Sequence, residues 1–245
     1  MKLNEQLLKI KKNIKFDNFK IDVGTSIDAP NSAHWLLKDN SVFVLGIEPN
    51  ITNVNILKNG SHKKPKFNYI NANSHSILKE DMFVKNYEPE RFSLLEKVAI
   101  DNVDKVIEEN FYCTSEINTG CSSLFKPSSL LEVDVERIDK VEVASLEYIL
   151  DSLDFPKDGH IMFVKTDTQG KDFDVVKSLR KYLKNVVALK CEYNTMNQYE
   201  NKENPKEFIA FMQHNGFILV NHTSYDFFFY NSKFSTFELF NLPAE

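Results

Sequence analysis

The chain has 245 residues, of which 42% are hydrophobic and 27% charged, a composition that fits one globular α/β domain with a large core. Its net charge of −5 argues against a nucleic-acid substrate, and no apolar run approaches the roughly 20 residues of a membrane span. Because the N-terminus also lacks a signal-peptide core, we expect a cytoplasmic protein. The three cysteines form no Cys-x-x-Cys pair and are expected to be buried thiols.

The first elements of the chain predict a helix, a strand, a turn and a second helix. Apolar residues recur at helical spacing over residues 3–13. Residues 19–23 are short, apolar and β-branched, which predicts a buried strand that ends at Gly24. A helix is then expected to start at Ser32, with Asn31 or Ser32 itself as its N-terminal cap.

The second strand, predicted over residues 42–47, is followed by Glu48 and Pro49. An acid in this place can accept both hydroxyls of a ribose, while the preceding helix N-terminus and loop amides face the ligand. A dinucleotide site requires three glycines after the first strand, but Gly24 stands alone between residues 22 and 32. The pattern therefore favours S-adenosylmethionine over NAD, and a plain βαβ unit with a surface glutamate remains the alternative.

The middle of the chain predicts a helix over residues 53–60 and a third strand over residues 67–72. If the cofactor interpretation holds, the end of that strand lies beside the adenine. A further helical tract is predicted from Glu90 to Glu109. The polar, hydroxyl-rich loop that follows, residues 111–128, contains Gly120 as a hinge, and long loops within compact domains are often functional. An ordinary surface connection is the alternative.

The last part of the chain alternates strands and helices. Residues 133–143 have strand character, Ser145 caps a short helix to Leu153, and the apolar run that starts at Ile161 ends in the polar residues Lys165, Asp167 and Gln169. Helices are predicted over residues 173–183 and 207–215, and strands over residues 186–192, 216–222 and 226–230. The terminal hairpin indicates a three-layer α/β/α sandwich with a mostly parallel, Rossmann-like, seven-stranded sheet whose last strand is antiparallel.

Five motifs in this order resemble the FkbM-type methyltransferases, S-adenosylmethionine-dependent enzymes that methylate hydroxyls on natural products and sugars. They are Asp22-Val23-Gly24, Gly46-Ile47-Glu48-Pro49, Gly120-Cys121-Ser122-Ser123-Leu124, the stretch from Val164 to Asp172, and Phe229-Tyr230-Asn231. The resemblance covers roughly residues 18–232. The chain departs from the family pattern at Asp28, where the usual glycine is missing, and at Asp172, which replaces a glutamate.

The resemblance implies a single methyltransferase domain over residues 1–245, with an inserted acceptor-loop region over about residues 77–145. The residues it implies for the cofactor are Asp22, Gly24, Thr25, Ser26, Asn31, Ser32, Glu48, Pro49, Asn71 and Ala72. Those it implies for the acceptor are Asn118, Thr119, Gly120, Ser122, Ser123 and Lys165. The acceptor is expected to be a small molecule, a sugar or nucleotide-linked sugar of the kind used for surface polysaccharides (capsule), with a secondary metabolite or a phosphate-type capsule modification as the alternatives.

The carboxylates of Asp167 and Glu192 are expected at the mouth of the site, since ligands in open α/β sheets bind beyond the carboxyl ends of the strands. Either acid, or a histidine such as His75 or His222, is the candidate base for the acceptor proton. A divalent metal between the two acids is possible but not favoured, because a third ligand is missing. An NAD-dependent oxidoreductase and a non-catalytic nucleotide-binding protein remain as other classes, and the sequence does not indicate the oligomeric state.

Overall fold

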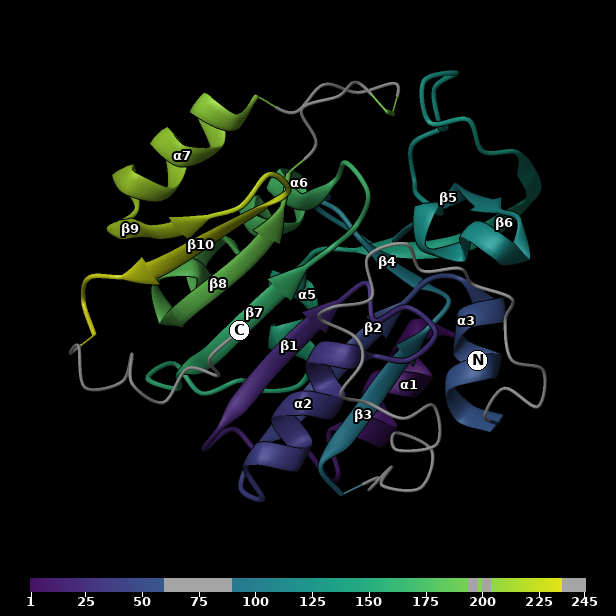
Figure 1. Ribbon diagram of the computed structural model, residues 1–245. Coiled ribbons are helices and arrows are strands. Elements are labelled where there is room, and N and C mark those ends of the chain that lie inside the picture. The colour runs from purple at the N-terminus through teal and green to yellow at the C-terminus, as the bar shows by residue number, and fades with distance from the viewer. Residues whose placement is uncertain (60–89, 194–197, 200–203, 235–245) are drawn as a thin grey trace.

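The computed structural model describes residues 1–59, 90–193, 198–199 and 204–234 of the chain. Its main sheet has seven strands in the order β3-β2-β1-β7-β8-β10-β9, as Figure 1 shows. These strands are β1 (Phe19–Val23), β2 (Phe43–Glu48), β3 (Phe92–Glu96), β7 (Ile161–Thr166), β8 (Val186–Glu192), β9 (Phe217–His222) and β10 (Asp226–Asn231). All neighbours are parallel except β10, which runs antiparallel to both β8 and β9. The predicted seven-stranded fold class is confirmed.

Helices cover both faces of this sheet and give the molecule three layers. The helices are α1 (Leu3–Ile10), α2 (Pro30–Lys38), α3 (Ile51–Asn59), α5 (Leu146–Ser152), α6 (Asp172–Lys177) and α7 (Pro205–His214), with a 3-10 helix, η2, over Arg180–Asn185. The larger core joins one face of the sheet to α1, α5, α6 and α7, while a second core packs α2 and α3 on the other face. Figure 1 shows α7 over β9 and β10.

The prediction of a helix from Glu90 to Glu109 is wrong. Residues 92–96 pair in parallel with β2, and Lys97, with φ of 58°, turns the chain away from the main sheet. The following residues form a separate small sheet of β4 (Val98–Ile100), β6 (Val135–Ala144) and β5 (Ile107–Thr114), in that order. The charged residues suggested a helix, but strand pairing decides the structure, since β-propensity depends on tertiary context.

The start of α2 also differs from the prediction. The helix begins at Pro30, after Ala29 in the left-handed region with φ of 42°, and no side chain caps it. Proline suits the first helical position because its missing N–H has no partner there in any case. Asn31 and Ser32 therefore lie in the first turn and are not caps. By contrast, Ser145 does cap α5, where its hydroxyl accepts the N–H of Tyr148.

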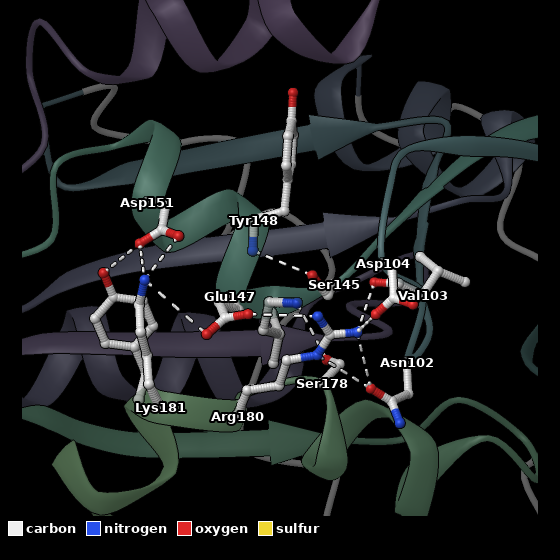
Figure 2. A network of polar contacts seen from close by, with 12 residues as sticks. Asn102, Val103, Asp104, Ser145, Glu147, Tyr148, Asp151, Ser178, Arg180 and Lys181 are labelled. Carbon is white, nitrogen blue, oxygen red and sulfur yellow. Dashed lines mark hydrogen bonds and ion pairs between the residues drawn. The ribbon is translucent and has the colours of Figure 1, made fainter.

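A polar network around Arg180 fastens the small sheet to the main body (Figure 2). The guanidinium donates to the carbonyl of Val103 at 3.0 Å and to the carboxylate of Asp104 at 2.7 Å, both in the connection between β4 and β5. Its other arm contacts Glu147 of α5 at 3.4 Å. Arg180, with φ of 45°, is the first residue of η2 and lies just after the end of α6. The predicted single helix over residues 173–183 is divided at this point.

Candidate active site

A cavity with about 620 Å³ of empty space opens beyond the carboxyl ends of β1, β2 and β7. It lies where the strand order reverses between β1 and β7, the place where open α/β sheets bind ligands. The lining residues are Val23, Gly24, Ser26, Ile47, Glu48, Pro49, Asn53, Val98, Ala99, Ile100, Phe111, Thr119, Gly120, Ser122, Leu124, Asp167, Thr168, Gln169 and Lys171.

The floor of the cavity depends on a close approach between Gly24 and Asp167. Gly24 has φ of 77°, and a Cβ atom on it would lie 2.0 Å from the carbonyl oxygen of Asp167. The N–H of Asp167 in turn donates to the carbonyl of Val23 at 3.1 Å. A glycine is therefore required here both by the backbone conformation and by the neighbouring strand end.

A buried ionic cluster lies beneath this floor. The carboxylate of Asp22 accepts the hydroxyl of Ser32 at 2.6 Å and its N–H at 3.2 Å, which ties β1 to the first turn of α2. The ammonium of Lys165 donates to the carbonyl of Gly24 at 2.6 Å and lies 3.4 Å from Asp22 and 3.7 Å from Asp167. Burial alone would lower the pKa of Lys165, but the charges of Asp22 and Asp167 outweigh it and raise that pKa.

Glu48 lies at the cavity wall with only 3% of its surface exposed. One carboxylate oxygen accepts the N–H of Ser26 at 2.8 Å, and the other accepts the N–H of Asn50 at 2.9 Å and the amide of Asn53 at 3.3 Å. Burial raises the pKa of Glu48 to about 7, although these hydrogen bonds favour the charged form. The group therefore changes its charge near neutral pH.

The polar loop reaches the cavity from the small sheet. It forms a 3-10 helix, η1 (Glu116–Cys121), and Thr119, Gly120 and Ser122 line the cavity. The Ser122 hydroxyl accepts the N–H of Thr114 at 3.1 Å and the amide of Asn50 at 3.2 Å, so it links this loop to the end of β2.

Three polar side chains meet on the other side of the cavity. The amide nitrogen of Gln169 is 2.7 Å from Asp167 Oδ1 and 2.7 Å from Glu192 Oε2. Asp167 keeps 44% of its side-chain surface exposed, and it lines the cavity, whereas Glu192 does not. Burial and then the charge of Asp167 raise the pKa of Glu192. For Asp167, the charge of Lys165 and its hydrogen bonds outweigh burial and lower the pKa.

The structure brings together many of the residues predicted for the site. Of these, Gly24, Ser26, Glu48, Pro49, Thr119, Gly120, Ser122 and Asp167 line the cavity, whereas Asp22, Thr25, Asn31, Ser32, Asn118, Ser123, Lys165 and Glu192 do not. Among the latter, Asp22, Ser32 and Lys165 support the floor. Asn118 is exposed, as is His222 at the end of β9. Asn71, Ala72 and His75 lie outside the described residues.

Sequence reasoning missed part of the lining. An apolar wall comes from Val98 and Ile100 in β4, which were predicted as helix, and from Phe111 in β5, which was predicted as the start of the polar loop. Lys171 was also missed. Its ammonium contacts Asp101 at 2.6 Å and lies 4.4 Å from the centre of the Phe125 ring. Gln169 was part of the predicted polar cluster, but its contacts with both acids required the three-dimensional structure.

Two features are absent from the part of the chain that the structure describes. There, no group of three or more histidine, cysteine or acidic side chains is arranged to hold a metal ion. None of the described helices has the length and apolar character required to traverse a lipid bilayer.

Comparison with known protein families gives a match over most of the chain. The family model described as "Methyltransferase FkbM domain" matches residues 17–219. Among solved structures, M. capricolum TrmK in complex with S-adenosyl-homocysteine shares 10% identity over 94% of this chain and 69% of that chain. The TM-score is 0.38, which is too low to support an argument from that likeness.

A likeness to a curated protein is also present. The periplasmic chaperone PpiD of Buchnera aphidicola subsp. Acyrthosiphon pisum (strain APS) is 24% identical over 228 residues, which is 82% of this chain. The matched region spans about a third of that relative, 34% of its length. This identity is too low to place the two chains in one family.

Proposed function

Because the chain belongs to the FkbM methyltransferase family, we propose that it transfers a methyl group from S-adenosylmethionine to a hydroxyl of a small acceptor. The observation that carries this proposal is the meeting of Gly24, Glu48 and Asp167 around one cavity at the switch point of the sheet. The two substrates require these three features: a turn without a side chain, a buried acid at the end of the second strand and a carboxylate after the neighbouring strand.

The residues around the cavity fit the cofactor. Gly24 lines the cavity, and the Glu48 carboxylate, which already accepts from Ser26, Asn50 and Asn53, keeps one lone pair on the oxygen that faces Ser26 and can accept a ribose hydroxyl there. The apolar wall of Val98, Ile100 and Phe111 suits the face of a purine. When bound, S-adenosylmethionine supplies an electrophilic methyl carbon, which the acceptor oxygen attacks as the carbon–sulfur bond breaks.

The protein's part in the reaction is alignment and removal of a proton. Holding the acceptor oxygen in line with the methyl carbon can contribute roughly 7–11 kcal/mol. Of the two candidate acids, Asp167 lines the cavity and Glu192 does not, and we infer that Asp167 accepts the hydroxyl proton, a role that contributes roughly 10²–10⁴-fold in rate. The ammonium of Lys165, which lies beneath the cavity floor, favours the ionised form of the Asp167 carboxylate.

We infer that the acceptor is a sugar or nucleotide-linked sugar, with a secondary metabolite as the alternative. The supporting observation is the polar part of the cavity, where Thr119 and Ser122 offer hydroxyl groups beside the Lys171 ammonium. Such groups can exchange hydrogen bonds with several hydroxyls of one ligand. Because a sugar presents hydroxyl groups, we propose that the methyl group is transferred to a hydroxyl oxygen.

Thermal shifts with S-adenosylhomocysteine, with NAD and without ligand test the cofactor. A rise in Tm with S-adenosylhomocysteine alone is expected, and a rise with NAD alone would refute the proposal. Labelled S-adenosylmethionine, offered with UDP-glucose, GDP-mannose and related sugars, then tests transfer and separates an enzyme from a binding protein. If the cofactor binds but no label moves to any of these sugars, the acceptor class is wrong.

Glu48→Ala tests the ribose contact. We expect cofactor binding to weaken by about 1.5–3 kcal/mol, the scale of hydrogen bonds to a charged group. The control is Glu5→Ala on the exposed side of α1, which should leave calorimetric affinity for S-adenosylhomocysteine unchanged. Equal affinities for wild type and Glu48→Ala would remove Glu48 from the cofactor site.

A further inference from the structure

A single amide group touches both acids of the candidate site. Gln169 Nε2 lies 2.7 Å from a carboxylate oxygen of Asp167 and 2.7 Å from one of Glu192. An amide nitrogen carries two hydrogens, so each carboxylate can accept one of them. The two acids follow neighbouring parallel strands, β7 and β8, which brings them to the same edge of the sheet.

The remaining polar atoms of Gln169 are fixed as well. Its side-chain oxygen lies 2.8 Å from the Tyr199 hydroxyl, and its backbone carbonyl accepts the Ser123 hydroxyl at 2.8 Å. The backbone has φ of 57°, a conformation that side-chain-bearing residues rarely adopt. Turning the amide over would place its oxygen against two carboxylates, so this environment selects the orientation in which the nitrogen faces the acids.

The surroundings give the two acids different charges. Lys165 of β7 lies 3.7 Å from Asp167 and favours its ionised form, and Lys190 of β8 acts in the same direction. Glu192 faces the charges of Asp167, Asp172 of α6 and Asp226 of β10, which together with burial favour its protonated form. Among the described residues, Cys121 and Tyr199 are also titratable groups near the two acids, and burial raises the pKa of each.

We propose that Gln169 is a positioning residue that makes Asp167 and Glu192 a pair holding one proton between them, with Asp167 facing the acceptor. This inference rests on the proposed function for its role in catalysis, but the pair itself exists without the cofactor. As the acceptor oxygen bonds to the methyl carbon, its proton passes to Asp167 and later leaves to water. Glu192 keeps its own proton, and Gln169 holds the ionised oxygen of Asp167 ready for the next cycle.

Gln169→Met tests the pair, because methionine keeps the length of the side chain and removes both N–H donors. The measurement is a ¹³C NMR titration of the side-chain carboxyls, with Asp167→Asn and Glu192→Gln to assign the two resonances. We expect the titration of the pair to move to higher pH by about one unit, since each acid loses a hydrogen bond that favoured its charged form. The titration is run on ligand-free protein and repeated with S-adenosylhomocysteine.

Two further variants separate positioning from a structural effect. Gln213→Met makes the same change at an exposed position of α7 and should leave both titrations where they are. Tyr199→Phe removes the hydroxyl that holds the Gln169 oxygen and should move the titration in the same direction by a smaller amount. If Gln169→Met does not fold, Tyr199→Phe still provides the test.

An unmoved titration in folded Gln169→Met, or in Tyr199→Phe where the methionine variant does not fold, overturns the proposal. The proposed function is judged separately, by calorimetry with S-adenosylhomocysteine and by label transfer. A shifted titration in a protein that binds no S-adenosylhomocysteine keeps the pair and removes the proposed function. Binding and transfer with an unmoved titration keep the function and remove the pair.

Discussion

Replacing Gly24 by alanine should destabilise the fold more than any other glycine-to-alanine change around the cavity. The new Cβ would lie 2.0 Å from the carbonyl oxygen of Asp167, far inside van der Waals contact, and the backbone has φ of 77°. The obstacle is main chain, so a side-chain rotation cannot relieve it. The ends of β1 and β7 would have to move apart.

The cost has two parts that other glycines allow us to separate. A left-handed conformation costs an alanine roughly 1–2 kcal/mol. Overpacking in a close-packed interior adds roughly 1–3 kcal/mol. Gly24→Ala should therefore lower the free energy of unfolding by about 2–5 kcal/mol. In a domain of this size, that corresponds to a fall in Tm of roughly 4–20 °C.

Two matched variants separate the conformational cost from the overpacking cost. Gly216 has φ of 84°, but the nearest atom to its Cβ position is 3.8 Å away, so Gly216→Ala measures the conformational part alone. Gly120 lies in η1 with nothing within 4 Å of its Cβ position, so Gly120→Ala should change the free energy of unfolding by less than about 0.5 kcal/mol. Urea denaturation and thermal scans of the ligand-free proteins give the three values.

The order Gly24 > Gly216 > Gly120 is the expected result. If Gly24→Ala costs no more than Gly216→Ala, the contact with Asp167 does not constrain the chain, and the close packing of the two strand ends is refuted. A large cost at Gly120 would instead show that a methyl group at this position of η1 meets a neighbouring atom in the folded protein.

Three other predictions concern charged side chains, namely Glu48, Lys165 and Arg180. Since the pKa of Glu48 is about 7 and ribose hydroxyls prefer the carboxylate, affinity for S-adenosylhomocysteine should fall about tenfold as the pH falls from 8 to 6, and calorimetry on Glu48→Gln should show no such loss. Lys165→Met leaves Asp22 buried without its cation and should cost about 3–5 kcal/mol in urea denaturation, part of which Asp22→Asn restores in the double variant. Arg180→Ala should lower the Tm by roughly 2–8 °C, whereas a Tm equal to wild type would mean that its contacts with Val103 and Asp104 add nothing.

Much of the main sheet could be predicted because its strands are short apolar runs with clear ends. Phe19–Val23 is found as predicted, and the strands that end near Glu48 and Glu192 differ from the predictions by at most one residue at each end. The run of β2 is buried on both faces and nearly continuously apolar, whereas β1 also buries Lys20 and Asp22, and in both cases the short length and the residues that end the run indicated a strand.

The small sheet could not be predicted in the same way. Residues 98–100 and 107–109 carry apolar and charged side chains at spacings that also fit a helix, and only pairing with β6 makes them strands. The carboxylates of Asp167 and Glu192 could be placed near one another from the strand ends alone. The amide of Gln169 between them could not, because its orientation depends on Tyr199 and Ser123, which lie far away in the sequence.

The chain leaves the main sheet at Lys97 and returns to it at Ser145. Two different parts of the fold therefore form the cavity. The floor comes from the main sheet, while the wall from Val98 to Leu124 belongs to a segment whose strands pair only with one another. A segment attached at two neighbouring points can be exchanged between relatives without breaking a strand pair of the main sheet. We therefore expect recombination at these two junctions to transplant acceptor choice from one member of the family to another, together with the apolar wall of Val98, Ile100 and Phe111, while Gly24 and Glu48 of the cofactor site stay the same.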